Sequence, residues 1–285
     1  MRSQSSHRKL RAAAVVCAAV AVAGPAPAAA WAATAPSAPA PSAPAPSAAA
    51  PSALVPAAAA PSPDPFDGLT PARIADRAVD ATRSADSLRM RGEIVADGQR
   101  LDVDFSVDDQ GSCQGRIGVD DGDAELRRLD GVTYMKGDEE FWRISTTSQR
   151  VPENQVAALI ELVKGRWLKI APGQAGSADL SDVCDLDSLL DGLGKDPEER
   201  RGLTRGPDRE VDGTPVATLV KKDGEETTTV SVAREGKPYI RQVVRTGGDE
   251  PGRMTLSDYD RPVKVTAPPA DETVDLSRLD PGTPA

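Results

Sequence analysis

Hydrophobic and polar side chains alternate strictly along residues 100–107. Every second residue is apolar, and the residues between are three charged side chains and a serine. Because successive side chains of a β-strand point to opposite faces, this pattern predicts a strand with one apolar and one solvated face. The flanking segments alternate in the same way, and together the three predicted strands place these residues on the apolar face: Leu88, Met90, Ile94, Leu101, Val103, Phe105, Val107, Cys113, Gly115, Ile117 and Val119.

Glycine-containing turn sequences separate most of these runs, and the same spacing returns near the end of the chain. Such dipeptides between alternating segments predict antiparallel hairpins. The turns are expected at Asp97-Gly98, Gln110-Gly111, Asp121-Gly122, Asp130-Gly131, Asp223-Gly224, Glu235-Gly236 and Gly247-Gly248.

Three other segments have helical spacing. Thr70 followed by Pro71 is typical of a helix start, and apolar residues follow at intervals of three and four. Apolar stripes ended by glycine predict two more helices, over 156–163 and 186–193.

The predicted order is a helix, a five-strand meander, a helical middle from about 138 to 202, and a second meander to about 258. Runs of strands on either side of a helical block predict an α+β fold, with helices on one face of an antiparallel sheet. We expect one domain over 66–275. The Pro-rich chain from 263 onward is expected to be irregular, and 276–285 to form a C-terminal tail.

The first 32 residues have the layout of a secretory signal peptide. Basic residues up to Arg11 precede a twelve-residue apolar run, and small residues lead to a cleavage site after Ala32. The run is shorter than the roughly 20 residues of a transmembrane helix. Cys17 follows a valine instead of a small residue, so we expect no lipid anchor there. Residues 33–65, rich in Ala, Pro and Ser, predict a disordered spacer, and the protein is expected to be exported.

Charge and histidine content exclude several classes of function. The chain has 44 acidic and 34 basic residues, a formal net charge of −10, which argues against a nucleic-acid partner. The single histidine, His7, lies in the predicted signal peptide, so the folded part lacks a Ser-His-Asp triad and His-ligated metal sites. We therefore expect no catalytic residue, no metal ligand and no cofactor.

Two cysteines remain after the predicted cleavage, Cys113 and Cys184. An even number of cysteines in an exported protein predicts a disulfide. Because Cys113 belongs to the apolar face and Cys184 precedes the helix expected over 186–193, the bond would hold that helix against the sheet.

The most distinctive stretch is residues 130–137, which predict a turn and a strand carrying Tyr134, followed by Phe141 and Trp142. Two interpretations stay open. These aromatic side chains pack the core, or they line a ligand cavity.

This stretch, the Ser-Leu-Arg-Met-Arg-Gly sequence at 87–92 and the preceding helix resemble the LppX/LprG-type envelope proteins of actinobacteria, which share their fold with the lipoprotein carrier LolA. The resemblance implies a curved antiparallel half-barrel that wraps a few helices, with an apolar cavity for acyl chains between them. It implies lipid or lipoprotein binding without catalysis. The chain departs from the family where a lipidated cysteine should stand.

Our hypothesis is an exported, non-catalytic envelope protein that carries an acyl lipid, glycolipid or lipoprotein between sheet and helices. Medium-sized apolar side chains and few aromatics favour such a cavity. Two alternatives stay open: an envelope interaction or regulatory module with a filled core, and a hydrolase that uses only carboxylates. The expected partners are an apolar ligand and membrane or envelope proteins. The candidate lining residues are Leu101, Val103, Phe105, Ile117, Val119, Tyr134 and Leu189.

Overall fold

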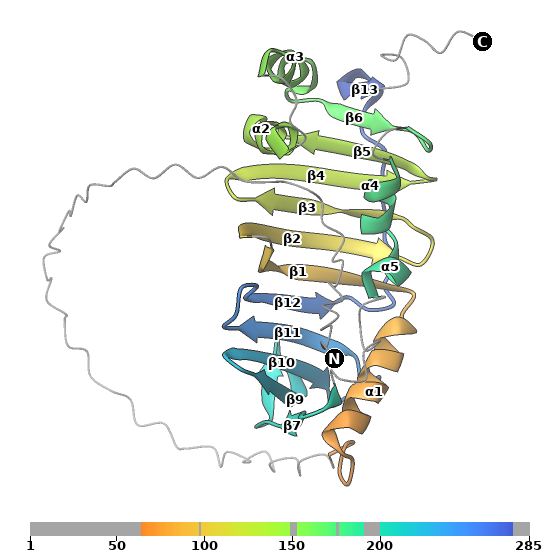
Figure 1. Cartoon of the computed structure of the whole chain (residues 1–285). Coiled ribbons are helices and arrows are strands. Elements are labelled where there is room, and N and C mark those ends of the chain that lie inside the picture. Colours follow the sequence, from red (N-terminus) through yellow and green to blue (C-terminus); the bar gives the residue numbers. More distant parts are fainter. Residues whose placement is uncertain (1–63, 97, 149–152, 175–176, 191–199, 276–285) are drawn as a thin grey trace, which may run out of the picture. The chain divides into compact units, whose positions relative to one another are not determined.

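The structure is a computed structural model that describes residues 64–275, except 97, 149–152, 175–176 and 191–199. The expected signal peptide, nearly all of the spacer and the tail from residue 276 lie outside the described residues. The described part holds one open, curved, mixed sheet of 13 strands, with helices packed against it (Figure 1).

The five-strand meander is confirmed. Each strand pairs antiparallel with the next, and the sheet register places the predicted apolar positions of the first three strands on one face, here called the inner face. These strands are β1 (Ser87–Ala96), β2 (Gln99–Asp108), β3 (Cys113–Val119), β4 (Gly122–Leu129) and β5 (Val132–Gly137).

The second meander is also present, and its last strand pairs antiparallel with β1, so both meanders form a single sheet. Four long strands make it up, and two short ones pair with its outermost strand. In chain order these are β7 (Thr204–Arg205), β8 (Arg209–Val211), β9 (Thr214–Asp223), β10 (Glu226–Ala233), β11 (Ile240–Thr246) and β12 (Gly252–Ser257).

The middle of the chain differs from the prediction in detail. Two helices were expected there, and its described residues form four: α2 (Glu139–Ser148), α3 (Glu153–Val163), α4 (Ser177–Val183) and α5 (Leu186–Leu190). A short strand, β6 (Trp167–Ile170), interrupts them and extends the sheet beyond β5. The expectation of an irregular tail is wrong at β13 (Thr273–Asp275), which pairs parallel with β6 and makes the sheet mixed; the short 3-10 turn η2 (Ala270–Glu272) precedes it.

The first helix, α1 (Pro71–Arg83), begins as predicted. The backbone N–H of Arg73 donates to the Thr70 hydroxyl, which caps the helix. At the other end, the Thr82 hydroxyl is buried and accepts a hydrogen bond of 3.0 Å from the N–H of Ile240, the first residue of β11. This bond joins the helix to the second meander.

Glycines on the inner face permit close strand contacts. A Cβ at Gly92 would lie 1.9 Å from the carbonyl oxygen of Arg253 on the neighbouring strand. Gly122, expected to be a turn residue, instead begins β4, and the turn lies one residue earlier, with Asp120 at φ 51°. Its missing side chain makes room for α2, because a Cβ there would lie 2.5 Å from the backbone nitrogen of Phe141.

Candidate functional site

Sheet pairing brings apolar residues from six neighbouring strands into one line across the inner face. Val103 on β2 lies directly between Gly92 on β1 and Ile117 on β3. On the other side of Gly92 the line continues through Met254 on β12, Val243 on β11 and Val230 on β10. Apart from the glycine, all of these side chains are half-buried.

A second line runs beside the first, two residues away along each of the strands β1, β2 and β3. Ile94 on β1 pairs with Leu101 on β2, and both side chains are half-buried. Leu101 pairs in turn with Val119, which is only 1% exposed. We call the seven half-buried side chains of the two lines the inner strip; they are Ile94, Leu101, Val103, Ile117, Val230, Val243 and Met254.

The helices cover other parts of the inner face. In Figure 1, α1, α4 and α5 lie over one half of the strands, where Leu88, Val107 and Cys113 are at most 1% exposed. Helix α2 covers the opposite half at β3, β4 and β5. There the Trp142 indole N–H donates to the carbonyl of Gly137, the last residue of β5, at 3.1 Å. The described helices therefore bury the surroundings of the inner strip and leave the strip itself partly accessible.

Of the seven predicted lining residues, Leu101, Val103 and Ile117 belong to the inner strip. Phe105 and Val119 share its face but are buried, at 2% and 1% exposure. Leu189 is half-buried on α5 and packs against the core.

Tyr134 does not share this surface. The register of β5 pairs it with Arg127 on β4 and Lys169 on β6, and it is Met135 that pairs with the inner-face residue Leu126. Tyr134 therefore lies on the opposite face, the outer face, so its assignment to the cavity is wrong. The indole of Trp167 shares that face, with the Arg127 guanidinium carbon 4.5 Å from its ring centre. Phe141 and Trp142 pack onto the core, which favours the packing interpretation for this pair.

Sequence reasoning missed Val230, Val243 and Met254. Val230 and Met254 occupy alternating positions in the second meander, a signal that was readable in the sequence, whereas Val243 is followed directly by Val244, so its face could not be read. These residues lie on the same line as Val103 only because β12 pairs with β1, and alternation along the chain does not reveal that pairing.

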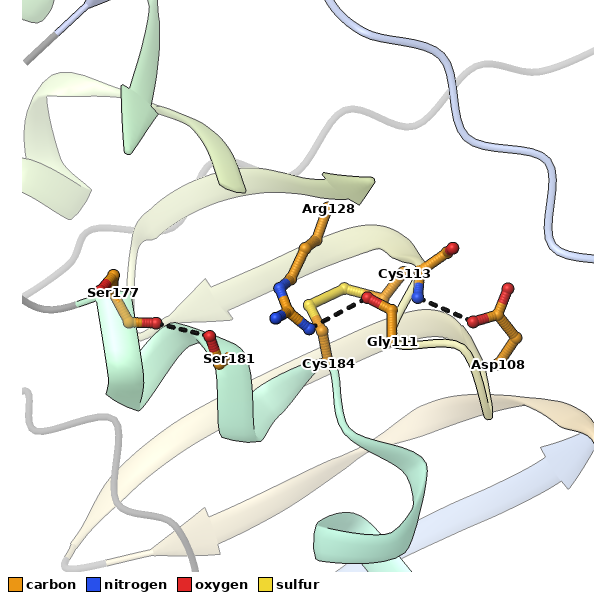
Figure 2. The surroundings of a disulfide bond; sticks show 8 residues. Asp108, Gly111, Cys113, Arg128, Ser177, Ser181 and Cys184 are labelled. Atoms are coloured by element: carbon orange, nitrogen blue, oxygen red, sulfur yellow. Dashed lines mark hydrogen bonds between the residues drawn. A yellow bond between two sulfur atoms is a disulfide. The ribbon is translucent and has the colours of Figure 1, made fainter. Parts of the chain in front are cut away.

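The predicted disulfide between Cys113 and Cys184 is present, with their Cα atoms 5.4 Å apart. Both residues are fully buried, and Cys184 lies between α4 and α5. Figure 2 shows the bond beside Arg128, whose guanidinium donates to the carbonyl of Gly111 at 3.1 Å. The Asp185 carboxylate accepts from the backbone N–H of Ser188 and caps α5. The bond thus holds the α4–α5 segment over the inner face.

Charged side chains gather on the outer face. Asp104 on β2 accepts hydrogen bonds from Arg89 at 2.7 Å and from Arg91 at 3.0 Å, both on β1. The hydrogen bond from Arg89 is the largest cause that holds the pKa of Asp104 below its ordinary value. On β1 and β2 the two faces are therefore chemically distinct, with apolar side chains on one and ion pairs on the other.

Neither a metal centre nor a membrane span is found in the described part of the chain. Its His, Cys, Asp and Glu side chains form no group of three that could hold a metal ion. None of its helices is long and apolar enough to cross a bilayer. The chemistry that the inner face offers is apolar contact.

No family model matches the chain, and neither does any curated protein. Similar solved structures include the lipoprotein LppX of Mycobacterium tuberculosis, at 14% identity over 69% of this chain and 98% of that one, with a TM-score of 0.43. LprF of Mycobacterium bovis is also 14% identical, over 70% of this chain and 96% of that one, with a TM-score of 0.47. The Pseudomonas aeruginosa MucA/MucB complex gives 15% identity over 74% and 61%, with a TM-score of 0.28. LppX belongs to the protein group that the sequence resembles.

Proposed function

We propose that this chain is an exported, non-catalytic envelope protein that binds an acyl lipid, a glycolipid or the acyl chains of a lipoprotein on the inner strip. The observation that carries the proposal is the strip itself, because seven apolar side chains from six neighbouring strands stay half-buried while other residues of the same face, such as Phe105, Val119 and Leu256, are buried. Contiguous apolar surface of this kind typically marks a binding site.

The dimensions of the strip favour a long apolar chain. Six neighbouring strands spaced about 4.8 Å apart extend over about 24 Å. One acyl chain in a bilayer leaflet spans about half of the roughly 30 Å hydrocarbon thickness. An extended acyl chain therefore fits along the line from Val230 to Ile117, crossing the sheet at Gly92, where no side chain intervenes.

The rest of the architecture supports a carrier. The disulfide holds α4 and α5 over the buried half of the inner face, which keeps that half closed while the strip stays accessible. The predicted signal peptide and spacer would deliver the domain outside the cytoplasm and hold it away from a surface. The acyl chains of cell-envelope lipids would then be the available apolar ligands.

Native mass spectrometry of the full chain, purified from the envelope and secreted fractions of an actinobacterial host, tests the proposal. The wild-type protein should carry acyl lipid. Val103→Trp should emerge without it, because the indole occupies the middle of the strip, and should lose little stability because the site is only half-buried. Tyr134→Trp adds an indole on the outer face and should keep the lipid. The proposal fails if the wild-type protein is empty, or if Val103→Trp is severely destabilised as in a filled core.

A further inference from the structure

The surface is hollowed on the outer face, over strands β11, β12 and β1. The hollow has a volume of about 520 Å³, within the size range of small-molecule sites. We call it the outer groove. Its principal side chains are Arg91, Glu93, Val244, Thr246, Arg253 and Thr255.

The register explains why the surface is hollow there. Thr255 on β12 pairs with Arg91 on β1, and Val244 on β11 pairs with Arg253 on β12. Short side chains therefore alternate with long ones across the three strands. Thr255 and Val244 form the floor, and the arginines rise around them.

The outer groove is positively charged, although the chain as a whole is acidic. Two arginine side chains, Arg91 and Arg253, and one glutamate line it, whereas the whole chain has a net charge of −10. Arg91 binds Asp104 through Nε and Nη2, which leaves the donors of Nη1 for a ligand. Arg253 is exposed and makes no ion pair with any residue that the structure describes.

The neighbouring Arg245 borders the groove only with its backbone. The register places its side chain on the inner face, where it lies 3.2 Å from the Glu226 carboxylate and 3.3 Å from that of Glu250. Glu93 lies 3.3 Å from Arg100, so its negative charge is also partly compensated. The unsatisfied donors of the outer groove are therefore those of Arg91 and Arg253. Thr255, on the same strand as Arg253, lies directly opposite Arg91, and its hydroxyl accepts from the Gln242 side chain at 3.2 Å.

We propose that the outer groove binds the phosphate group of a polar ligand, with Arg91 and Arg253 as the principal contacts. Guanidinium groups donate in a planar fork that matches phosphate oxygens. Donors from two neighbouring strands, β1 and β12, suit a tetrahedral oxyanion better than a planar carboxylate, which one arginine satisfies alone. The site lies on the face opposite the inner strip and does not depend on the proposed carrier function.

The test is calorimetric titration of the full chain at low salt with glycerol 3-phosphate, inorganic phosphate and acetate. We expect both phosphates to bind and acetate to bind at least ten-fold more weakly. Arg253→Gln and Arg91→Gln should each weaken phosphate binding by about ten-fold. Arg116→Gln is the matched control, because Arg116 lies on the outer face of β3, outside the groove, with its side chain 75% exposed.

Three outcomes would overturn the proposal: no phosphate binding, equal binding of acetate, or an equal loss of binding in Arg116→Gln, which would indicate only a general charge effect. Thermal unfolding of each variant verifies that the fold is intact. Val103→Trp should bind phosphate like the wild-type protein, so failure of the outer groove and failure of the lipid site are distinguishable.

Discussion

The ring of Phe105 lies where a side chain at Gly115 would begin. The two residues are direct cross-strand neighbours on β2 and β3, and a Cβ built on Gly115 would lie 2.9 Å from Cγ of Phe105 and 2.1 Å from the carbonyl oxygen of Asp104. Both contacts are closer than van der Waals distance allows. The glycine therefore leaves room for the aromatic ring beside the neighbouring strand, and Phe105 is buried at 2% exposure.

Gly115→Ala should destabilise the protein by about 1–3 kcal/mol, because the added methyl group meets backbone that cannot move away cheaply. Gly118→Ala is the matched control on the other face of the same strand. Its Cβ would meet the Asp102 and Asp123 side chains at 3.2 and 3.3 Å, which can adjust. Urea unfolding measures both variants, and an equal loss of stability in the two would contradict this account.

Loss of the disulfide should lower the free energy of unfolding substantially. The bond closes a loop with a sequence separation of 71, which in the chain-entropy model corresponds to roughly 4 kcal/mol. The double variant Cys113→Ser, Cys184→Ser should therefore unfold at lower urea concentration, as should the reduced wild-type protein. Limited proteolysis should then cut first near α4 and α5. An unfolding midpoint that does not respond to reductant would show that the bond does not stabilise the fold.

The hydrogen bond between α1 and β11 can be tested with two substitutions at Thr82. Thr82→Val keeps the shape of the buried side chain but leaves the N–H of Ile240 without its acceptor, which should cost about 1–3 kcal/mol. Thr82→Ser keeps the hydroxyl and should retain the bond. Chemical denaturation separates the two, and a valine variant as stable as the wild-type protein would contradict the assigned role.

The Asp104 ion pairs predict a pH dependence on the acid side. Because the folded-state pKa of Asp104 is lowered, chiefly by Arg89, the stabilisation is present above the unfolded-state pKa of about 4 and is lost as pH falls through the folded-state pKa. Asp104→Asn should therefore be less stable than the wild-type protein at pH 7, and the difference should shrink below about pH 4. Asp121→Asn, in an exposed turn, should show no comparable change. A difference that stays constant down to pH 2 would contradict the ion-pair explanation.

Alternation along the chain was enough to assign the faces of β1, β2 and β3, because apolar residues or glycine occupy every second position over 88–94, 101–107 and 113–119. It failed at Tyr134, since residues 132–135 read Val-Thr-Tyr-Met and are compatible with either face. The register with β4 decides the matter and puts Thr133 and Met135 inside. The polar Thr133 is buried at 2% exposure, which no local pattern predicts.

Contacts distant in sequence account for the rest. The inner strip is continuous only because β12 pairs with β1, and residues such as Gly92 and Met254 are separated by most of the domain. Strand β6 has four residues and lies between helices, so its apolar positions resemble part of the helical block. The outer groove arises because β12 pairs with both β1 and β11, so the local sequence pattern could not predict it either.

Photo-crosslinking with a long-chain fatty acid that carries a diazirine on its alkyl chain tests the central claim most directly. Irradiation of the full chain followed by peptide mapping should label residues of the inner strip on both meanders, above all Val103, Ile117, Val243 and Met254. An excess of unlabelled fatty acid should remove this labelling, and Val103→Trp should abolish it. Labelling confined to outer-face positions such as Tyr134, or scattered and insensitive to competitor, would contradict the account.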